Sequence, residues 1–244
     1  MRINQFRHLR IERGVGLREQ FRRFCQMGRD KKGIAAVEFA LILPFMMLLY
    51  LGTAELTYGL MANRKMTLAA RTLSDLVAQQ NDPTSATPAQ ITDTKLTTIF
   101  AAATAIMSPF SATPLKMAVS SIGFTANTAT PPVYTAKTQW TAVSNSGTPR
   151  PCSVNLTSVA NTAHPSSTTM PAGLFGAGSV IVADVSYDFT PPFSGTIFSW
   201  TQSGWGQTAK SSITFTQTTY MKPRSVDNVT YNPTTAVVGR TKCP

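Results

Sequence analysis

Glu38 is the residue whose chemistry fits its surroundings least, because it is the sole charged side chain in the apolar run 34–54. A carboxylate at membrane depth is costly, so it is expected to have a partner or a task. A cut after Gly33 would create an α-amino group on Ile34, one helical turn from Glu38, where opposite charges meet. The amine of a neighbouring copy is a second candidate partner. In an uncut chain, Glu38 would instead reach toward the cytoplasmic headgroups.

Two aspartates are the other pair that could do chemistry. Asp184 and Asp188 lie four residues apart in the segment 180–189 and could bind a cation or act as an acid and a base. However, polar and apolar residues alternate here, with Ile181 and Val185 on the face opposite both aspartates. This alternation favours a solvated strand face.

The remaining reactive residue types do not have the spacing of a known site. Cys152, Cys243 and His164 lack a short C-x-x-C or H-x-x-x-H pattern, so we expect no metal site. The glycines of 173–178 are not followed by a Lys-Ser/Thr pair and indicate a loop. With no nucleophile assigned to a base, the sequence predicts no enzyme and no cofactor.

The element that positions Glu38 is long enough to cross a membrane. As a helix, 34–54 covers roughly 31 Å, the thickness of a bilayer's hydrocarbon core. Ten lysines and arginines against three carboxylates in residues 1–33 carry +7 of the formal net charge of +11. Arg64, Lys65 and Arg71 are the bases in the next twenty positions, so the N-terminus is expected in the cytoplasm. Because the basic charge belongs mainly to a leader, we expect no nucleic-acid partner.

The rest of the chain shows helical and then strand periodicity. Small and apolar residues recur every three or four positions as far as Gln80, which predicts an amphipathic extension of the first helix. A second helix is expected at 92–107. Strands are expected at 117–124, 133–142, 180–189 and 212–221. Within the second of these strands, Ala136 and Trp140 are expected on one face.

These elements predict an α+β fold: a long N-terminal transmembrane helix that extends into a head with a mainly antiparallel sheet and a second short helix. The expected parts are a basic leader (1–33), a transmembrane helix (34–58), a helical extension (59–81) and an α+β head (82–244). Residues 144–171 are rich in Thr, Ser and Pro, which predicts a mobile loop; a partner-binding loop is the alternative.

The start of the apolar run resembles a known export signal. Gly33, four apolar residues, Glu38 and Phe39 resemble the class III signal of type IV pilins. More specifically, residues 33–44 resemble the TadE/TadG-like minor pseudopilins of the tight-adherence (Tad/Flp) pilus. The resemblance implies that a membrane prepilin peptidase cuts the Gly33–Ile34 bond and that Glu38 becomes the fifth residue of the mature chain.

Two later segments resemble the closing motifs of the same family, Y-x-[YF]-x-P and Y-x-x-P-R. The residues that carry these motifs are Tyr187, Phe189, Pro191, Tyr220, Pro223 and Arg224. The Thr/Ser/Pro-rich middle of the chain, from about 125 to 170, has no counterpart in the family pattern.

The cysteine count fits this processing. Three cysteines are an odd number for an exported chain, but Cys25 lies in the leader and is removed by a cut after Gly33. Cys152 and Cys243 remain. We expect them to form a disulfide once the head reaches an oxidising compartment.

The expected function is that of a structural minor pseudopilin in a bacterial inner membrane, with its head in the periplasm, which takes part in pilus assembly or priming and in surface adherence. The resemblance implies as partners the prepilin peptidase, other minor pseudopilins, the major Flp-type pilin and the inner-membrane assembly platform. Two alternatives stay open: an uncleaved single-pass anchor that presents a binding or sensing head, and a soluble periplasmic enzyme released by cleavage near Ala54.

Overall fold

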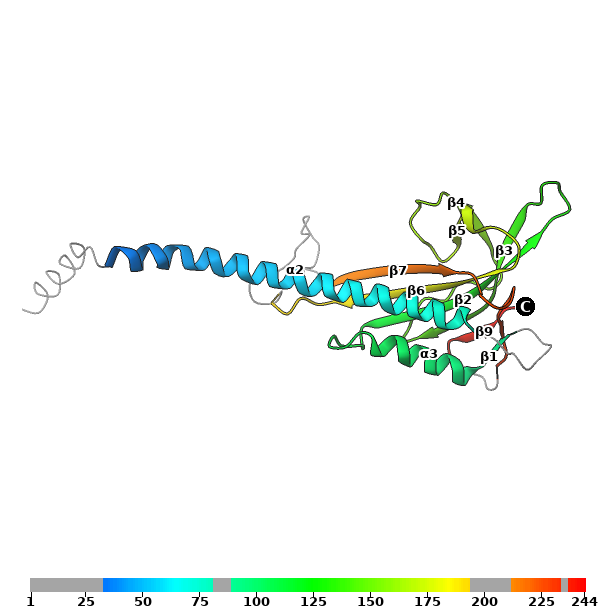
Figure 1. The fold of residues 1–244 in the computed structure, drawn as a ribbon, viewed down its shortest axis with the longest axis horizontal. Coiled ribbons are helices and arrows are strands. Elements are labelled where there is room, and N and C mark those ends of the chain that lie inside the picture. Colours follow the sequence, from blue (N-terminus) through cyan, green and yellow to red (C-terminus); the bar gives the residue numbers. More distant parts are fainter. Residues whose placement is uncertain (1–32, 81–88, 194–211, 234–236) are drawn as a thin grey trace, which may run out of the picture. The chain divides into compact units, whose positions relative to one another are not determined.

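The computed structural model describes residues 33–80, 89–193, 212–233 and 237–244. The predicted leader lies outside the described residues apart from Gly33, and so does Cys25. The described elements, in chain order, are Ile34–Ala78 (α2), Gln90–Ile91 (β1), Asp93–Ala105 (α3), Leu115–Ala126 (β2), Tyr134–Ser144 (β3), Asn155–Val159 (β4), Thr169–Pro171 (β5), the 3-10 helix Ala172–Leu174 (η2), Ser179–Phe189 (β6), Ile213–Met221 (β7), Thr230–Tyr231 (β8) and Arg240–Lys242 (β9) (Figure 1).

Helix α2 has two parts with different surroundings. Residues 33–50 are all exposed, and the apolar N-terminal part has the length and composition of a membrane-crossing helix. From Glu55 onward α2 buries small and apolar side chains at helical spacing, including Ala62, Met66 and Leu73. The chain divides into two compact units between Ala54 and Glu55. The predicted long apolar helix is therefore confirmed, and its packed part begins inside the range 34–58 predicted for the membrane.

The head contains a mainly antiparallel sheet, as the sequence predicts. Its described strands follow the order β5-β4-β3-β2-β6-β7, and β9 pairs with β3 beside β4. Neighbours in this sheet are antiparallel except β4 and β5, which are parallel. Strands β1 and β8 form a separate parallel pair. The predicted strands at 117–124, 133–142, 180–189 and 212–221 correspond to β2, β3, β6 and β7.

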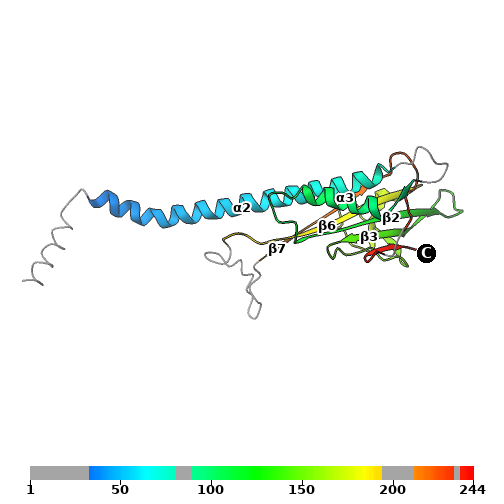
Figure 2. The same ribbon diagram turned by 90° about the horizontal axis from the view of Figure 1, so that it is seen from below.

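The main hydrophobic core lies between the helices and one face of this sheet. In Figures 1 and 2 the packed part of α2 and the whole of α3 run side by side over β2 and β6. Helix α3 begins at Asp93, where the Thr92 side chain accepts a hydrogen bond from the Lys95 N–H (3.5 Å). On the sheet side, Ile181 and Val185 enter this core, as their period of two predicts.

A smaller core lies on the other face of the sheet. Val180 and Val182 alternate with the main-core residues of β6 and therefore point to this second face. Leu156 of β4 and Met170 of β5 cover them. The predicted loop at 144–171 is thus corrected: it contains two short strands, because its few apolar side chains pack on the valines of this sheet face and bury them.

A β-bulge changes the faces of β3. Trp140 pairs with Ser121 and Thr138 with Ile122, so Gln139 is the extra residue. As a result Trp140 enters the main core, whereas Ala136 enters the second one. The prediction that these two side chains share a face is wrong, because a period of two fails across an inserted residue.

The C-terminal strand β9 is tied to α3 by buried polar groups. Arg240 Nη1 lies 3.0 Å from Asp93 Oδ1, and both side chains are 8% exposed. The Tyr231 hydroxyl donates to the same oxygen at 2.6 Å. Burial, followed by this hydrogen bond, raises the pKa of Tyr231 to about 12.

Candidate functional site

The exposed apolar part of α2 carries the residues predicted for processing. Gly33 lies directly before the first helical residue, Ile34, and Glu38 lies one turn further along the same helix. All three residues and Phe39 are exposed, and Phe39 keeps 65% of its surface accessible. None of the ion pairs between described residues includes Glu38. The site therefore consists of a helix start with an exposed carboxylate in an apolar surface.

A second carboxylate, which the sequence reasoning missed, marks the start of the packed helix. Glu55 is 5% exposed, and its Oε1 accepts a hydrogen bond from the Phe193 backbone N–H at 2.8 Å. Next to it lies an apolar cavity of about 170 Å³, whose lining includes Gly59, Phe189 and Phe215. The available sequence signal was that Glu55 is the first charged residue after the apolar run.

The first closing motif packs beside this cavity. Phe189 and Pro191 are buried, and a Cβ atom on Gly59 would lie 3.5 Å from Phe189 Cε1, so the ring contacts the helix backbone closely. The ring also stacks on Phe215 with centroids 6.0 Å apart. Tyr187 donates its hydroxyl to the Ser111 carbonyl at 3.1 Å, and burial raises the pKa of Tyr187.

The second closing motif lies at the other end of the packed helix. The Arg224 backbone N–H donates to the carbonyl of Ala78, the last residue of α2, at 3.0 Å. The Arg224 guanidinium also forms an ion pair with Asp75. Pro223 precedes this contact and is partly exposed. Tyr220 packs against the second core, and burial raises its pKa, with Arg150 nearby opposing the shift.

The two motifs therefore contact opposite ends of the packed part of α2. The residues around Phe189 contact α2 near Glu55 and Gly59, and Arg224 caps it at Ala78. A helix C-terminus has carbonyl groups without intrahelical partners, and the Arg224 N–H satisfies one of them. Chemically, this arrangement positions a helix; it does not assemble an acid, a base and a nucleophile.

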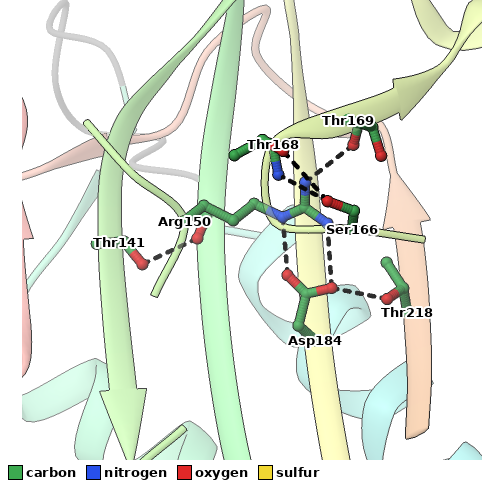
Figure 3. Close-up of polar contacts among 8 residues, drawn as sticks. Thr141, Arg150, Ser166, Thr168, Thr169, Asp184 and Thr218 are labelled. Atoms are coloured by element: carbon green, nitrogen blue, oxygen red, sulfur yellow. Dashed lines mark hydrogen bonds and ion pairs between the residues drawn. The ribbon is translucent and has the colours of Figure 1, made fainter. Parts of the chain in front are cut away.

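Arg150 holds the predicted loop against the sheet (Figure 3). Its side chain is fully buried, with Nε 2.7 Å from Asp184 Oδ2 and Nη2 3.1 Å from Asp184 Oδ1. Nη1 donates to the Thr169 carbonyl at 3.2 Å, and the Thr218 hydroxyl donates to Asp184 Oδ1 at 2.7 Å. Nothing in the spacing of Arg150 indicates this role, because its partner lies 34 residues away.

The expected solvated face of β6 is corrected at this point. Asp184 is covered by Arg150, and Asp188 pairs with Lys116 Nζ at 2.9 Å. Thr214 also donates to Asp188 Oδ1 at 2.6 Å. The two aspartates thus have separate cationic partners. In the described part of the chain, no three His, Cys, Asp or Glu side chains are grouped to hold a metal ion.

The predicted disulfide is present. Cys152 and Cys243 are bonded, with their Cα atoms 5.1 Å apart and a sequence separation of 91. The bond joins the segment that carries Arg150 to the residue just after β9. The Cys243 N–H also donates to the Gln139 carbonyl at 2.8 Å, which continues the pairing of β9 with β3.

A family model described as TadE-like protein matches residues 33–74 of the chain. The match starts at Gly33 and includes Glu38, Glu55 and most of the packed part of α2. Searches of the curated proteins and of the solved structures found no match. The closing motifs lie beyond residue 74, so their resemblance stays a prediction. The match confirms the resemblance proposed from Gly33 and Glu38: residues 33–74 of this chain are TadE-like.

Proposed function

We propose that this chain is a structural minor pseudopilin of a Tad/Flp-type pilus, cut after Gly33 by a prepilin peptidase. The observation that carries the proposal is that the family match and the helix start at adjacent residues, with Glu38 at a fixed distance from this start. The TadE-like match begins at residue 33, α2 begins at Ile34, and Glu38 stands at the fifth position of the helix.

The cut creates a charge that can neutralise Glu38. Lipid provides little drive for helix association, so close packing and the neutralisation of a carboxylate select neighbouring helices. Removal of the leader exposes the α-amino group of Ile34 one turn from Glu38. This amine, or the amine of a neighbouring subunit, neutralises Glu38 when the subunit enters an assembly.

The head holds the C-terminal part of the same helix. Its core buries α2 from Glu55 to Ala78, and Arg224 caps the end. We therefore propose an inner-membrane anchor with a cytoplasmic leader and a periplasmic head. Its partners in this proposal are the prepilin peptidase, other minor pseudopilins, the major Flp-type pilin and the assembly platform, and its roles are assembly or priming and surface adherence.

Intact-mass analysis and N-terminal sequencing test the processing step. We expect that co-expression of the chain with its peptidase produces a mature protein that begins at Ile34. A Gly33→Leu variant is expected to keep its leader under the same conditions. A wild-type chain that keeps the leader supports the uncleaved anchor, and an N-terminus near residue 55 supports the released periplasmic protein; either result overturns the proposal.

A separate experiment tests Glu38 in assembly. A Glu38→Ala variant is expected to stay inserted in the membrane, because the change makes the helix more apolar, yet to support few or no pili. Leu41→Ala, which also changes an exposed residue of the same helix, is the control and is expected to assemble. Normal piliation by the Glu38 variant would remove the assembly role of this carboxylate.

A further inference from the structure

A polar groove lies at the end of the head farthest from Glu55. Its cavity has a volume of about 300 Å³ and is lined by residues of β2, β3, β8 and β9, among them Gly123 and Lys242. Strand register gives its place: Leu115 of β2 pairs with Tyr187, near the cavity beside Glu55, whereas Gly123 pairs with Ser179. Eight residues of strand separate the two ends, about 26 Å.

The charged side chains that line the groove are both basic. Lys137 and Lys242 are exposed and line it from neighbouring strands, β3 and β9. No Asp or Glu side chain is found in the lining, and neither lysine takes part in an ion pair within the ranges that the structure describes. Two unneutralised ammonium groups at one cavity favour an anionic ligand.

The groove also has buried polar atoms that lack partners. Thr138 is 2% exposed, and its Oγ1 makes no hydrogen bond with the described residues. The same is true of Asn228 Oδ1, and both residues line the cavity. Buried polar atoms are nearly always bonded, so each such atom calls for an explanation. Both oxygens are closed to solvent, so a ligand hydroxyl reaches them only when the side chains of the lining shift.

Backbone features shape this surface. The β-bulge places Gln139 as an extra residue, and a Cβ atom on Gly123 would lie 2.2 Å from Gln139 Nε2. Glycine at 123 therefore makes room for the Gln139 side chain, whose Oε1 accepts from Ser121 at 3.2 Å. β-Bulges occur often beside binding sites, where they redirect a side chain. The disulfide at Cys243 anchors the backbone next to Lys242.

We propose that this groove binds an anionic saccharide, in which a carboxylate or phosphate meets Lys137 and Lys242 while ring hydroxyls meet the partly exposed amide of Gln139. The volume fits a small part of such a ligand. The proposal gives the suggested adherence function a ligand class, but it concerns binding by the purified chain. It therefore succeeds or fails whether or not the protein is processed or enters a pilus.

Calorimetric titration of the full-length protein in detergent tests the proposal. The probes are a tetrasaccharide of galacturonic acid, glucose 1-phosphate, neutral maltotetraose and inorganic phosphate. We expect at least one of the two acidic sugars to bind more tightly than maltotetraose and inorganic phosphate, and the stronger one identifies the anion. Absence of binding, equal binding of maltotetraose, or equal binding of inorganic phosphate overturns the proposal.

Variants locate the site. The double variant Lys137→Gln/Lys242→Gln is expected to bind the acidic sugar at least about tenfold more weakly, because two charge-assisted contacts are lost. Lys95→Gln/Lys222→Gln removes two exposed lysines outside the groove and is the matched control, with unchanged affinity expected. An equal loss of affinity in the groove variant and in the control variant means that net charge alone attracts the sugar. That result overturns the proposed site.

Gly123→Ala provides a test that changes no charge. The added methyl group displaces the Gln139 side chain, so we expect weaker binding of the acidic sugar at an unchanged number of lysines. Gly176→Ala is the control, because a Cβ atom at Gly176 meets no other atom within 4 Å. Unchanged affinity of a folded Gly123→Ala protein contradicts a site built on Gln139.

Discussion

Arg224 donates its backbone N–H to the carbonyl of Ala78, the last residue of α2, at 3.0 Å. At the other end of the packed helix, Glu55 accepts the N–H of Phe193 at 2.8 Å. Each contact comes from the chain that follows a strand, β7 in one case and β6 in the other. The helix is therefore held by hydrogen bonds at both ends as well as by its buried side chains.

Glu55→Ala is expected to destabilise the head by about 1–3 kcal/mol, because the Phe193 N–H loses this buried acceptor. Urea unfolding of the detergent-solubilised protein, followed by tryptophan fluorescence, measures the effect. Leu56→Ala is the control, since the Leu56 side chain is 64% exposed and its removal changes little. Equal stability of the Glu55 variant and wild type would show that the bond is not needed.

Arg150→Ala is expected to cost about 3–5 kcal/mol, because it leaves the partly buried Asp184 carboxylate without its cation. The double variant Arg150→Met/Asp184→Leu is expected to be more stable than Arg150→Ala, since it removes both charges. Thermal unfolding of the three proteins gives the comparison. A double variant no more stable than Arg150→Ala contradicts this explanation.

Loss of the disulfide is expected to destabilise the head by about 4–5 kcal/mol in the chain-entropy model, given the separation of 91 residues. The Cys152→Ser/Cys243→Ser protein, compared with wild type in urea, measures this loss. Addition of dithiothreitol is expected to lower the stability of wild type and to leave the variant unchanged. Cys25→Ser controls for the third cysteine and is expected to behave as wild type.

Alkaline pH is expected to weaken the contact of Tyr231 with α3. The folded-state pKa of Tyr231 is about 12, against 10.0 for an unperturbed tyrosine, so the folded state binds its proton more tightly. This contribution is fully present below pH 10 and is lost between about pH 10 and pH 12, by about 3 kcal/mol.

Unfolding measured from pH 9 to pH 12 checks this dependence. Tyr231→Phe is expected to lose stability less steeply over this interval, because it has no proton to release. Tyr134→Phe, at a partly exposed position of β3, is the control and is expected to follow the wild-type curve. Parallel curves for wild type and Tyr231→Phe would contradict the assignment.

Local periodicity was sufficient to predict most of the elements. The apolar run and its extension predicted α2, and the alternation in 180–189 predicted β6 and its buried face. The exposed apolar run is predicted by its length and composition. The extension of α2 and strand β6 are predicted because each buries a face whose spacing repeats over several residues. The match to the TadE-like family covers this strongly patterned N-terminal part of the chain.

Features that depend on distant partners could not be predicted in this way. Arg150 lies in a polar segment, and its burial depends on Asp184, 34 residues later. The bulge at Gln139 breaks the period on which strand prediction relies. Glu55 stood beside the apolar run, but its acceptor role depends on Phe193, 138 residues away.

The bond between Cys152 and Cys243 also affects how the head withstands proteases. Strands β6 and β7 and the Arg224 cap all lie between the two cysteines. A single cut of the backbone anywhere in this interval leaves both fragments covalently joined and the helix cap attached. A head built in this way keeps all parts of its fold connected after a single backbone cut.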